Sequence, residues 1–333
     1  MKKRIIMTLI TTVLAAGVVA CQNVSEQTED IEVIDFEKIA VKTELDKSEI
    51  SESKTLDENV DVLSTKQRYE SFLKGEEPLY FNQYMPNGYE AIQFEKTKGY
   101  TMSDLLTVLK DKYIDVDMDM EINYAYLDCG NDGVEELAIR FNGINVEGPE
   151  ISTQVYVIKE IEGKLECCYY YETWSRSNTD INCYGYVTSN GSNGASNHGY
   201  DAGYIDADGK WNFIHYTEEE WNIDGLFIDE TLGEVPEIAA SKQYEGYIVV
   251  TTTRFEEILT DEDFYNMKNY YAYYVDGVEG DVYSEGIYKD IFDEAGVKMY
   301  RPEEIEAMIL EKEASLGITE EIKQGAEVIW EIL

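Results

Sequence analysis

The sequence has few basic residues and almost no histidine. It contains 27 Lys and Arg against 68 Asp and Glu, and only two His. The formal net charge of the 333-residue chain is -41. This charge excludes nucleic acid as a partner, because neutralising phosphates requires a basic surface. It also predicts repulsion from anionic lipid head groups and makes divalent cations the natural counterions.

The sequence also lacks the short motifs that mark common enzymes. It has no Gly-x-Ser-x-Gly elbow, no His-Glu-x-x-His and no phosphate-binding loop. A glycosidase needs only two carboxylates at a set distance, and a chain with 68 acidic residues can supply such a pair anywhere. The sequence therefore assigns no catalytic residue, and a carboxylate-based glycan hydrolase remains an alternative.

Cysteine is scarce, and its spacing does not indicate a zinc site. Besides Cys21, the thiols are those of Cys129, Cys167, Cys168 and Cys183. There is no Cys-x-x-Cys pair, and the two histidines are far apart in the sequence. A disulfide between Cys167 or Cys168 and Cys129 or Cys183 is one alternative. The favoured interpretation is free, buried thiols, because free Cys packs as a small hydrophobe.

The N-terminus has the pattern of a secretory signal. A basic start at residues 2–4 precedes an uncharged, mostly apolar run over 5–20, which ends in small residues before Cys21. The run is too short for a good membrane-spanning helix. Residues 1–20 are therefore predicted to be a signal peptide. A cysteine at the first mature position resembles the lipobox of bacterial lipoproteins. That resemblance implies a diacylglycerol thioether on Cys21 and membrane anchoring on the extracytoplasmic face. Secretion with an unmodified cysteine is the alternative.

The segment that follows differs in composition from the rest of the chain. Residues 21–63 are rich in Glu, Asp, Ser, Lys and Thr, and Phe36 is their single aromatic residue. Such a segment buries too little apolar area to offset its chain entropy. It is predicted to be an acidic, disordered tether that carries a folded domain over residues 64–333.

The centre of the predicted domain is a hairpin over residues 121–141. Ile122, Tyr124 and Tyr126 alternate with other residues before the turn, as in a strand. A second alternation follows the turn at 137–141. Asp132-Gly133 lies between the two runs, and Asp-Gly is a strong signal for a tight turn.

The hairpin loop also carries acidic residues at a spacing typical of calcium loops. Such loops place oxygen ligands at alternate positions and a glycine at position six, which here is Gly133. The candidate ligands are Asp128, Asp132, the Val134 carbonyl and Glu136. Position three is Gly130, which has no side-chain ligand, and position twelve is Ile139, so an EF-hand is excluded. The loop is predicted either to bind Ca²⁺ weakly or to be a solvated hairpin turn.

The same residues carry a resemblance to a known group of proteins. The pattern is Tyr124-Ala125, Asp128, Gly130-Asn131-Asp132-Gly133 and Glu136-Leu137. It resembles the loops of FG-GAP-type β-hairpins in surface proteins, and it is similar to a segment of uncharacterised lipoproteins of Gram-positive bacteria. The resemblance covers some twenty residues closely. It implies a surface lipoprotein and a cation at the loop, and it brings no activity with it.

The remaining patterns predict an α+β domain, mainly an antiparallel β-meander with short flanking helices. Helices are predicted after Ser64, from Thr101 to about Lys112, from Pro302 to Gly317, and from Thr319 through Ile332. Strands are predicted over 154–161, 165–173, 181–187, 200–206, 210–216 and 244–254. The Ser-, Asn- and Gly-rich segment 188–199 is predicted to be an exposed loop.

The aromatic residues allow two interpretations. Aromatic rings on a sheet face can stack on sugar rings, and the strongest candidates are Tyr169, Tyr170, Tyr171 and Trp174. Ordinary packing of tyrosine in strands is the favoured interpretation, and the sugar-binding face is the alternative. Together, these patterns predict a lipid-anchored binding or interaction protein of the cell envelope, with a cell-wall glycan or a protein as its partner.

Overall fold

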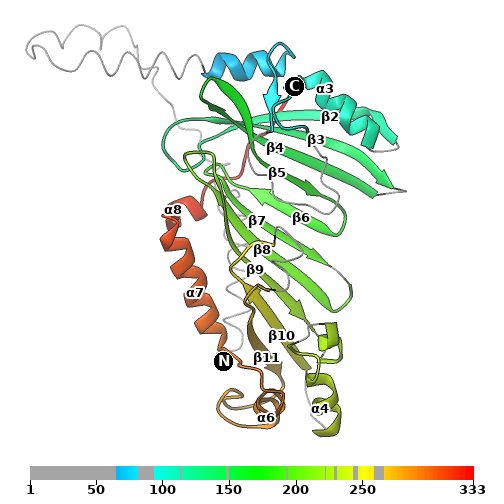
Figure 1. The fold of residues 1–333 in the computed structure, drawn as a ribbon, viewed down its shortest axis with the longest axis vertical. Coiled ribbons are helices and arrows are strands. Elements are labelled where there is room, and N and C mark those ends of the chain that lie inside the picture. The colour runs from blue at the N-terminus through cyan, green and yellow to red at the C-terminus, as the bar shows by residue number, and fades with distance from the viewer. Residues whose placement is uncertain are drawn as a thin grey trace, which may run out of the picture. The chain divides into compact units, whose positions relative to one another are not determined.

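The structure is a computed structural model that describes residues 65–81, 94–112, 115–147, 150–192, 194–221, 223–228, 231–242, 247–258 and 266–333. The predicted signal peptide, the predicted tether and Cys21 lie outside these residues. All described residues belong to one unit, Thr55–Leu333. Within it, two mostly antiparallel sheets and several short helices form an α+β fold, as the sequence predicts (Figure 1).

The first sheet has six strands in the order β1-β5-β4-β3-β2-β12. Their bounds are β1 Leu79–Tyr80, β2 Asp115–Leu127, β3 Glu136–Glu147, β4 Glu150–Ile161, β5 Lys164–Thr173 and β12 Glu331–Ile332. The predicted central hairpin is the β2–β3 pair, in which Leu127 lies opposite Glu136. Short β1 pairs with β5 in parallel, and the other pairs are antiparallel.

The second sheet is an antiparallel meander in the order β11-β10-β9-β8-β7-β6. Its strands are β6 Ser177–Ile181, β7 Tyr186–Ser192, β8 Asn197–Ile205, β9 Trp211–Glu220, β10 Tyr247–Arg254 and β11 Tyr270–Asp276. A tight turn joins the two sheets, because β5 ends at Thr173 and β6 begins at Ser177.

The helices lie around these sheets. They are an unlabelled helix over 65–73, α3 Met102–Lys112, the 3₁₀ helix η2 Ile223–Ile228, α4 Val235–Lys242, α6 Ile287–Glu294, α7 Pro302–Ser315 and α8 Glu320–Lys323. Figure 1 shows α7 running beside the second sheet, and buried Glu313 of α7 receives a hydrogen bond from Tyr186 of β7.

Local sequence signals explain several helix ends. Thr101 N–H donates to Asp104 Oδ2 at 2.9 Å, and Asp104 N–H donates to Thr101 Oγ1 at 3.3 Å, which is the predicted capping box of α3. Pro302 opens α7, where a missing N–H is tolerated. Gly317 follows the helix with φ +74°, a conformation that glycine adopts without strain.

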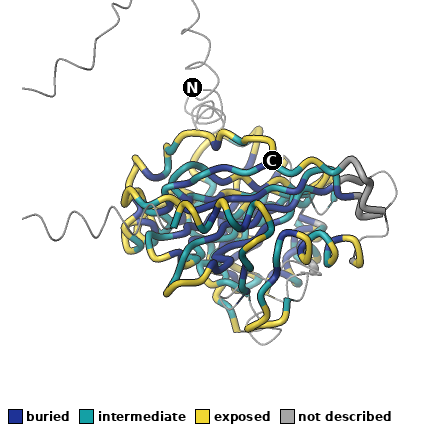
Figure 2. Tube along the Cα trace, turned by 90° about the horizontal axis from the view of Figure 1, so that it is seen from above, coloured by how far each residue is buried: buried dark blue, intermediate teal, exposed yellow. Residues whose placement is uncertain are grey.

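The apolar core of the described residues consists of separate clusters that together reach into both sheets. Buried residues run through the interior of the layers, whereas most exposed residues lie at turns and outer helix faces (Figure 2). Leu137, Tyr156 and Leu165 belong to a cluster on one side of the first sheet. Val157 and Tyr169 pack in another cluster with Val187 and Ile205 of the second sheet.

Two sequence predictions about this region are wrong. The predicted strand 181–187 is a turn over 182–185 between β6 and β7, and most of the predicted loop 188–199 lies in β7 and β8. Packing accounts for one of the glycines that suggested a loop. A Cβ at Gly199 would lie 2.7 Å from the Tyr216 hydroxyl, so the ring leaves no room for a side chain.

The predicted last helix is also mostly wrong. Thr319 caps α8 as predicted, by accepting from Ile322 N–H, but the helix ends at Lys323. Asn182 Nδ2 donates to the Ile322 carbonyl at 2.7 Å, and a Cβ at Gly325 would lie 2.8 Å from the Asn182 side chain. These contacts hold the chain after Lys323 in a non-helical conformation, and it ends as β12, which pairs with β2.

Candidate functional site

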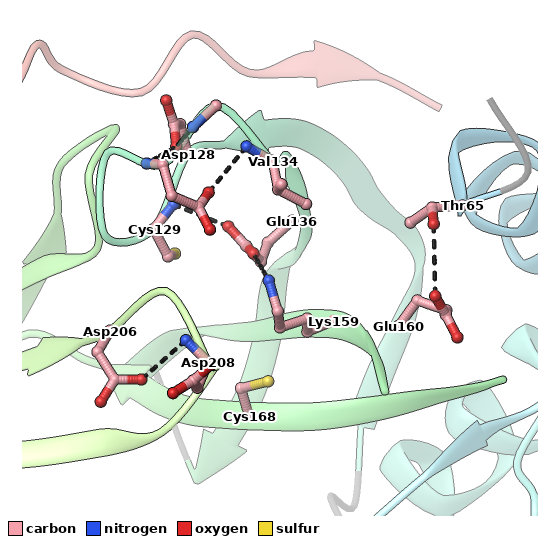
Figure 3. A network of polar contacts seen from close by, with 12 residues as sticks. Thr65, Asp128, Cys129, Val134, Glu136, Lys159, Glu160, Cys168, Asp206 and Asp208 are labelled. Carbon is pink, nitrogen blue, oxygen red and sulfur yellow. Dashed lines mark hydrogen bonds and ion pairs between the residues drawn. The ribbon is translucent and has the colours of Figure 1, made fainter. Parts of the chain in front are cut away.

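The loop predicted to bind calcium connects β2 to β3 and is held by its own side chains (Figure 3). Asp128 Oδ1 accepts hydrogen bonds from the backbone N–H groups of Asp132 and Gly133, both at 2.9 Å. Asp132 Oδ1 accepts one from Val134 N–H at 2.8 Å. These two carboxylates therefore stabilise the turn, as Asp side chains commonly do.

The fourth predicted ligand, Glu136, points into the protein. Its side chain is 0% exposed, and its Oε1 forms an ion pair with Lys159 of β4, whose side chain is 12% exposed. Glu136 Oε2 accepts a hydrogen bond from Cys129 N–H at 2.7 Å. Burial raises the pKa of the Glu136 carboxyl, and the Lys159 ammonium opposes that increase.

The predicted ligands therefore do not converge on one point in this arrangement. Within the described ranges, no group of three or more His, Cys, Asp or Glu side chains is placed to hold a metal ion. Glu136 would have to leave Lys159 in order to bind a cation next to Asp128 and Asp132. Calcium binding at 128–136 stays a prediction.

The loop also connects distant parts of the chain. Asp128 N–H donates to the Cys183 carbonyl at 2.8 Å, and Gly130 N–H donates to the Tyr184 carbonyl at 3.1 Å. Gly130 has φ +87°, and a Cβ there would lie 2.5 Å from the backbone nitrogen of Ala207. The loop thus fits between the 182–185 turn and the 206–209 turn, which gives it a structural role.

The four described cysteines are free thiols, as the favoured sequence interpretation predicts. Cys129, Cys167 and Cys168 are buried, and Cys183 is partly buried. Burial raises the pKa of the Cys168 thiol to about 12. A thiol with so high a pKa is a poor nucleophile at neutral pH, so Cys168 is a structural residue.

The predicted aromatic surface is present at only one of its four positions. Tyr169 and Tyr170 are each 5% exposed and Tyr171 is 9% exposed, whereas Trp174 is 40% exposed. Successive strand residues point to opposite sides of a sheet, and here both sides are covered. Tyr169, for example, stacks on Trp211 with ring centroids 4.1 Å apart. The three tyrosines are core residues, which confirms the favoured interpretation of ordinary strand packing and contradicts the alternative of a sugar-binding face.

Trp174 instead forms one wall of an open pocket of about 340 Å³ at the β6 edge of the second sheet. The pocket is lined by Trp174, Ser175, Arg176, Ser177, Asn178, Asn190, Gly191, Ser192, His198 and Tyr200. A second large aromatic side chain, that of Tyr200, is also 40% exposed. This pocket, called the 174–200 pocket below, combines exposed rings with polar groups, as ligand sites commonly do.

Backbone hydrogen bonds fix the shape of the pocket. Trp174 N–H donates to the Ser177 carbonyl at 2.8 Å, and Ser177 N–H donates to the Trp174 carbonyl at 3.0 Å. Ser192 N–H donates to the Arg176 carbonyl at 2.9 Å, which ties this turn to β7. Trp174 and Arg176 are therefore carried by a tight turn whose backbone is held on both sides.

The floor of the pocket is built by strand register. Asn178 of β6 lies opposite Asn190 of β7, and Asn190 lies opposite Tyr200 of β8. In the next row, Ser192 lies opposite His198. Amide and hydroxyl groups thus line three adjacent strands between the aromatic side chains.

The charge of the pocket differs from that of the whole chain. Its lining, as far as the described residues form it, contains Arg176 and no acidic residue. Asp180 and Glu219 lie near the rim, where they accept hydrogen bonds from Asn178 Nδ2 at 2.5 Å and from Trp221 Nε1 at 3.1 Å. Burial is the largest cause of the raised pKa of the Tyr200 hydroxyl, and the Glu219 charge adds to it.

Another polar cluster lies on the opposite face of the second sheet. Asp201 of β8 lies opposite Tyr216 of β9, and Tyr216 lies opposite Arg254 of β10, whose guanidinium lies 4.0 Å from the Tyr216 ring centroid. Trp211 Nε1 donates to Glu257 Oε1 at 3.2 Å. Burial raises the pKa values of Asp201 and Glu257, and the Asp201 charge raises that of Glu257 further. No motif or spacing in the sequence selects these two carboxylates.

Most residues of the 174–200 pocket were also missed by sequence reasoning. Asn190, Ser192 and His198 fall in the segment predicted to be a loop. An available signal was the alternation of His198 and Tyr200 with glycine and aspartate, which extends the predicted strand at 200–206 toward the N-terminus. Arg176 had no signal, because only the turn between the sheets places it beside β7.

Comparisons of the chain with family models, with curated proteins and with solved structures find no match in any of the three. Among the residues that the structure describes, no helix is both long enough and apolar enough to cross a membrane.

Proposed function

We propose that this chain is a lipid-anchored binding protein on the extracytoplasmic face of the cell membrane. The basic start, the uncharged run and Cys21 support the anchor. Two acyl chains on one cysteine would give stable membrane attachment where a single chain is marginal. The acidic segment 21–63 would act as an extended linker, because like charges repel along it.

The observation that carries the binding role is the 174–200 pocket. Its rings are exposed, its turn is fixed by backbone hydrogen bonds, and its lining consists mainly of amide, hydroxyl and aromatic groups. A preformed site of this kind loses little entropy when a ligand binds. Among the described residues, no carboxylate or thiol lines the pocket, so its lining supplies neither the carboxylate pair of a glycosidase nor a cysteine nucleophile.

The anchor is tested by growing cells that express the full chain with labelled fatty acid. The native chain is expected to carry the label and to sediment with membranes. A Cys21→Ala chain is expected to be unlabelled. Label that persists in this variant, or a native chain without label, would contradict lipid anchoring at Cys21.

The binding role is tested by co-sedimentation of the mature chain, made with Cys21→Ser, with purified cell walls. Trp174→Ala and Tyr200→Ala are expected to abolish binding. Tyr247→Ala and Tyr274→Ala are matched controls, because these side chains are 50% and 44% exposed and lie outside the pocket lining. Equal loss in the controls, or no loss in the pocket variants, would contradict the assignment of the pocket.

A glycan hydrolase is the second candidate, and Asp201 and Glu257 are the observation that favours it. Both carboxyls have raised pKa values, as acid–base groups of glycosidases commonly do, and the Asp201 charge contributes to the raised pKa of Glu257. The hypothesis predicts release of reducing sugar ends from cell-wall glycans by the mature chain. Asp201→Asn and Glu257→Gln should each abolish that release, and an inactive native chain would remove this candidate.

A further inference from the structure

We infer that the 174–200 pocket binds a short segment of a glycan that carries an acidic substituent, and that Arg176 receives this substituent. The inference rests on the proposed binding function and names the class of its ligand. It is argued from the rings, the floor, the size and the charge of the pocket.

The exposed rings point to a ligand with flat apolar faces. Trp174 comes from the turn before β6 and Tyr200 from β8, and each leaves 40% of its surface in contact with solvent. A ligand that covers such a ring with an apolar face gains binding energy, because apolar surface is removed from water. Sugar rings present C–H faces that pack on aromatic rings while their hydroxyls stay free for hydrogen bonds.

The floor provides the groups that those hydroxyls need. Asn178 and Asn190 face each other on adjacent strands and offer amide donors and acceptors. Ser192 and His198 form the next cross-strand pair. Asn178 already donates to Asp180, which leaves its carbonyl oxygen as an acceptor toward a ligand. A neutral, hydroxyl-rich ligand would satisfy these groups, whereas a purely apolar ligand would leave them unpaired.

The size of the pocket limits how much of the glycan it holds. Small-molecule sites commonly enclose roughly 300–1,000 Å³. The volume here is about 340 Å³, at the lower end of that range. The pocket therefore fits about one or two sugar rings of a longer chain rather than a folded protein partner.

The charge of the lining points to an anionic group on that glycan. Acidic residues make up 68 of the 333 residues, so a lining of ten would hold about two by composition, but it holds none. Arg176 is exposed, and no ion pair joins its guanidinium to an acidic residue within the described parts of the chain. A guanidinium can donate two parallel hydrogen bonds to a carboxylate, sulfate or phosphate.

The acidity of the rest of the chain opposes the approach of such a ligand, but salt limits this effect to short range. At physiological ionic strength, charges more than about 8 Å apart are largely screened. The carboxylates named at the rim, Asp180 and Glu219, already accept hydrogen bonds from protein donors. The absence of acids from the lining is therefore what allows an anionic substituent to reach Arg176.

The inference is tested on a glycan array with the mature chain carrying Cys21→Ser. The array presents neutral oligosaccharides beside oligosaccharides with uronic acid, sulfate or glycerol phosphate groups. The native chain is expected to retain acidic glycans in preference to neutral ones. The strongest acidic glycan and its neutral parent are then titrated by calorimetry against the native chain and the variants.

The variants separate charge recognition from stacking. Arg176→Gln is expected to weaken binding of the acidic glycan about tenfold and binding of its neutral parent less than about twofold, as for loss of one charge-assisted hydrogen bond. Arg176→Lys should restore part of the loss. Lys210→Gln makes the same change of charge at an exposed residue outside the pocket lining and should have no effect. Trp174→Ala should weaken both ligands. Circular dichroism and melting confirm folding of each variant.

The outcomes distinguish the inference from the proposed function. The native chain could instead prefer neutral glycans and lose that binding in Trp174→Ala. This result would overturn the inference that the ligand carries an acidic substituent, and it would leave the proposed binding function intact. An acidic preference that survives Arg176→Gln would overturn the role of Arg176. Retention of no glycan would overturn the ligand class, and cell-wall binding that depends on Trp174 would then show that the pocket binds another ligand.

Discussion

Single residues of this protein owe their properties mainly to burial. Glu136 was selected from the sequence as a surface ligand, but its fully buried carboxylate is paired with Lys159. A buried ion pair gives little net stability compared with apolar packing, yet breaking it leaves an uncompensated charge in the interior. The neighbouring pair of Glu135 and Lys66 is 3.6 Å apart and about half exposed on both sides, which offers a direct comparison.

Lys159→Met is expected to lower the free energy of unfolding by about 3 kcal/mol, because Glu136 loses its cation while buried. Lys66→Met should change it by less than about 1 kcal/mol, as for an exposed pair. Urea unfolding measures both. In a double mutant, Glu136→Gln with Lys159→Met should cost less than the sum of the two single changes. Additive costs would contradict a coupled pair.

His215 predicts a pH dependence of stability. Burial lowers its pKa from 6.5 to about 4, Lys323 adds to the decrease, and the Glu313 charge opposes it. Its buried Nδ1 has no hydrogen-bond partner among the residues that the structure describes. Because the folded state binds the proton less readily than the unfolded state, this residue costs no stability above the unfolded pKa. Its cost grows as the pH falls through 6.5 and levels off below about 4.

Between pH 6.5 and about 4, His215 is expected to lower the free energy of unfolding by about 3 kcal/mol. His215→Gln should remove that share of the acid sensitivity, as measured by urea unfolding over the same pH range. His198→Gln is the control, because His198 is only partly buried and lies beside the exposed Trp221 ring. Identical pH profiles for the native chain and His215→Gln would contradict the prediction.

At the scale of elements, the 128–136 loop packs between the 182–185 turn and the 206–209 turn. Its two glycines have similar backbone conformations but different surroundings. Gly130 has φ +87° and would place a Cβ 2.5 Å from Ala207, whereas Gly133 has φ +81° and a Cβ there would have no atom of the described residues within 4 Å. Alanine substitutions at the two positions therefore separate the cost of backbone strain from the cost of disturbing the contact between the loop and Ala207.

Gly133→Ala is expected to cost about 1–2 kcal/mol, the cost of a left-handed conformation for a residue with a Cβ. Gly130→Ala should cost clearly more, because the 206–209 turn must also move. Thermal melting compares the two variants. Equal costs would show that contact with Ala207 does not contribute to stability.

The same loop decides the calcium hypothesis. If Asp128, Asp132 and Glu136 rearrange to hold Ca²⁺, the melting temperature of the mature chain should rise with added calcium and fall back with chelator. Asp132→Asn should reduce the increase, and Asp208→Asn, in the facing turn, serves as its control. Equal melting temperatures with and without calcium would remove the hypothesis.

For the whole molecule, charge is the dominant property. A formal charge of -41 is a source of self-repulsion in any compact state. Raising the salt concentration from about 10 mM to about 150 mM shortens the Debye length from about 30 Å to about 8 Å. We expect the melting temperature of the mature chain to rise over this range by about 2–4 °C, the shift that about 1 kcal/mol produces.

Calorimetry in sodium chloride measures this shift, and magnesium chloride at equal ionic strength is the comparison. Equal increases in the two salts indicate screening alone, whereas a larger increase in magnesium indicates ion binding by carboxylates. A melting temperature that falls with sodium chloride would contradict self-repulsion as a main term in the stability of this domain.

The sequence by itself determined the class of the fold, the central hairpin, the capping box at Thr101 and the helix that begins at Pro302. These depend on alternation, caps and turns between residues close in the chain. It also led to the proposed anchor at Cys21, which lies outside the described residues.

Only the tertiary structure decided how distant segments meet. Strand pairing divided the predicted meander into two sheets, buried Tyr169 to Tyr171 between covered faces, and turned Glu136 toward Lys159. The same pairing brought Trp174 and Arg176 beside Asn190 and Tyr200. A local pattern specifies which residues alternate, but not which layer covers each side. Burial, and with it the candidate site, therefore depended on contacts between residues far apart in the sequence.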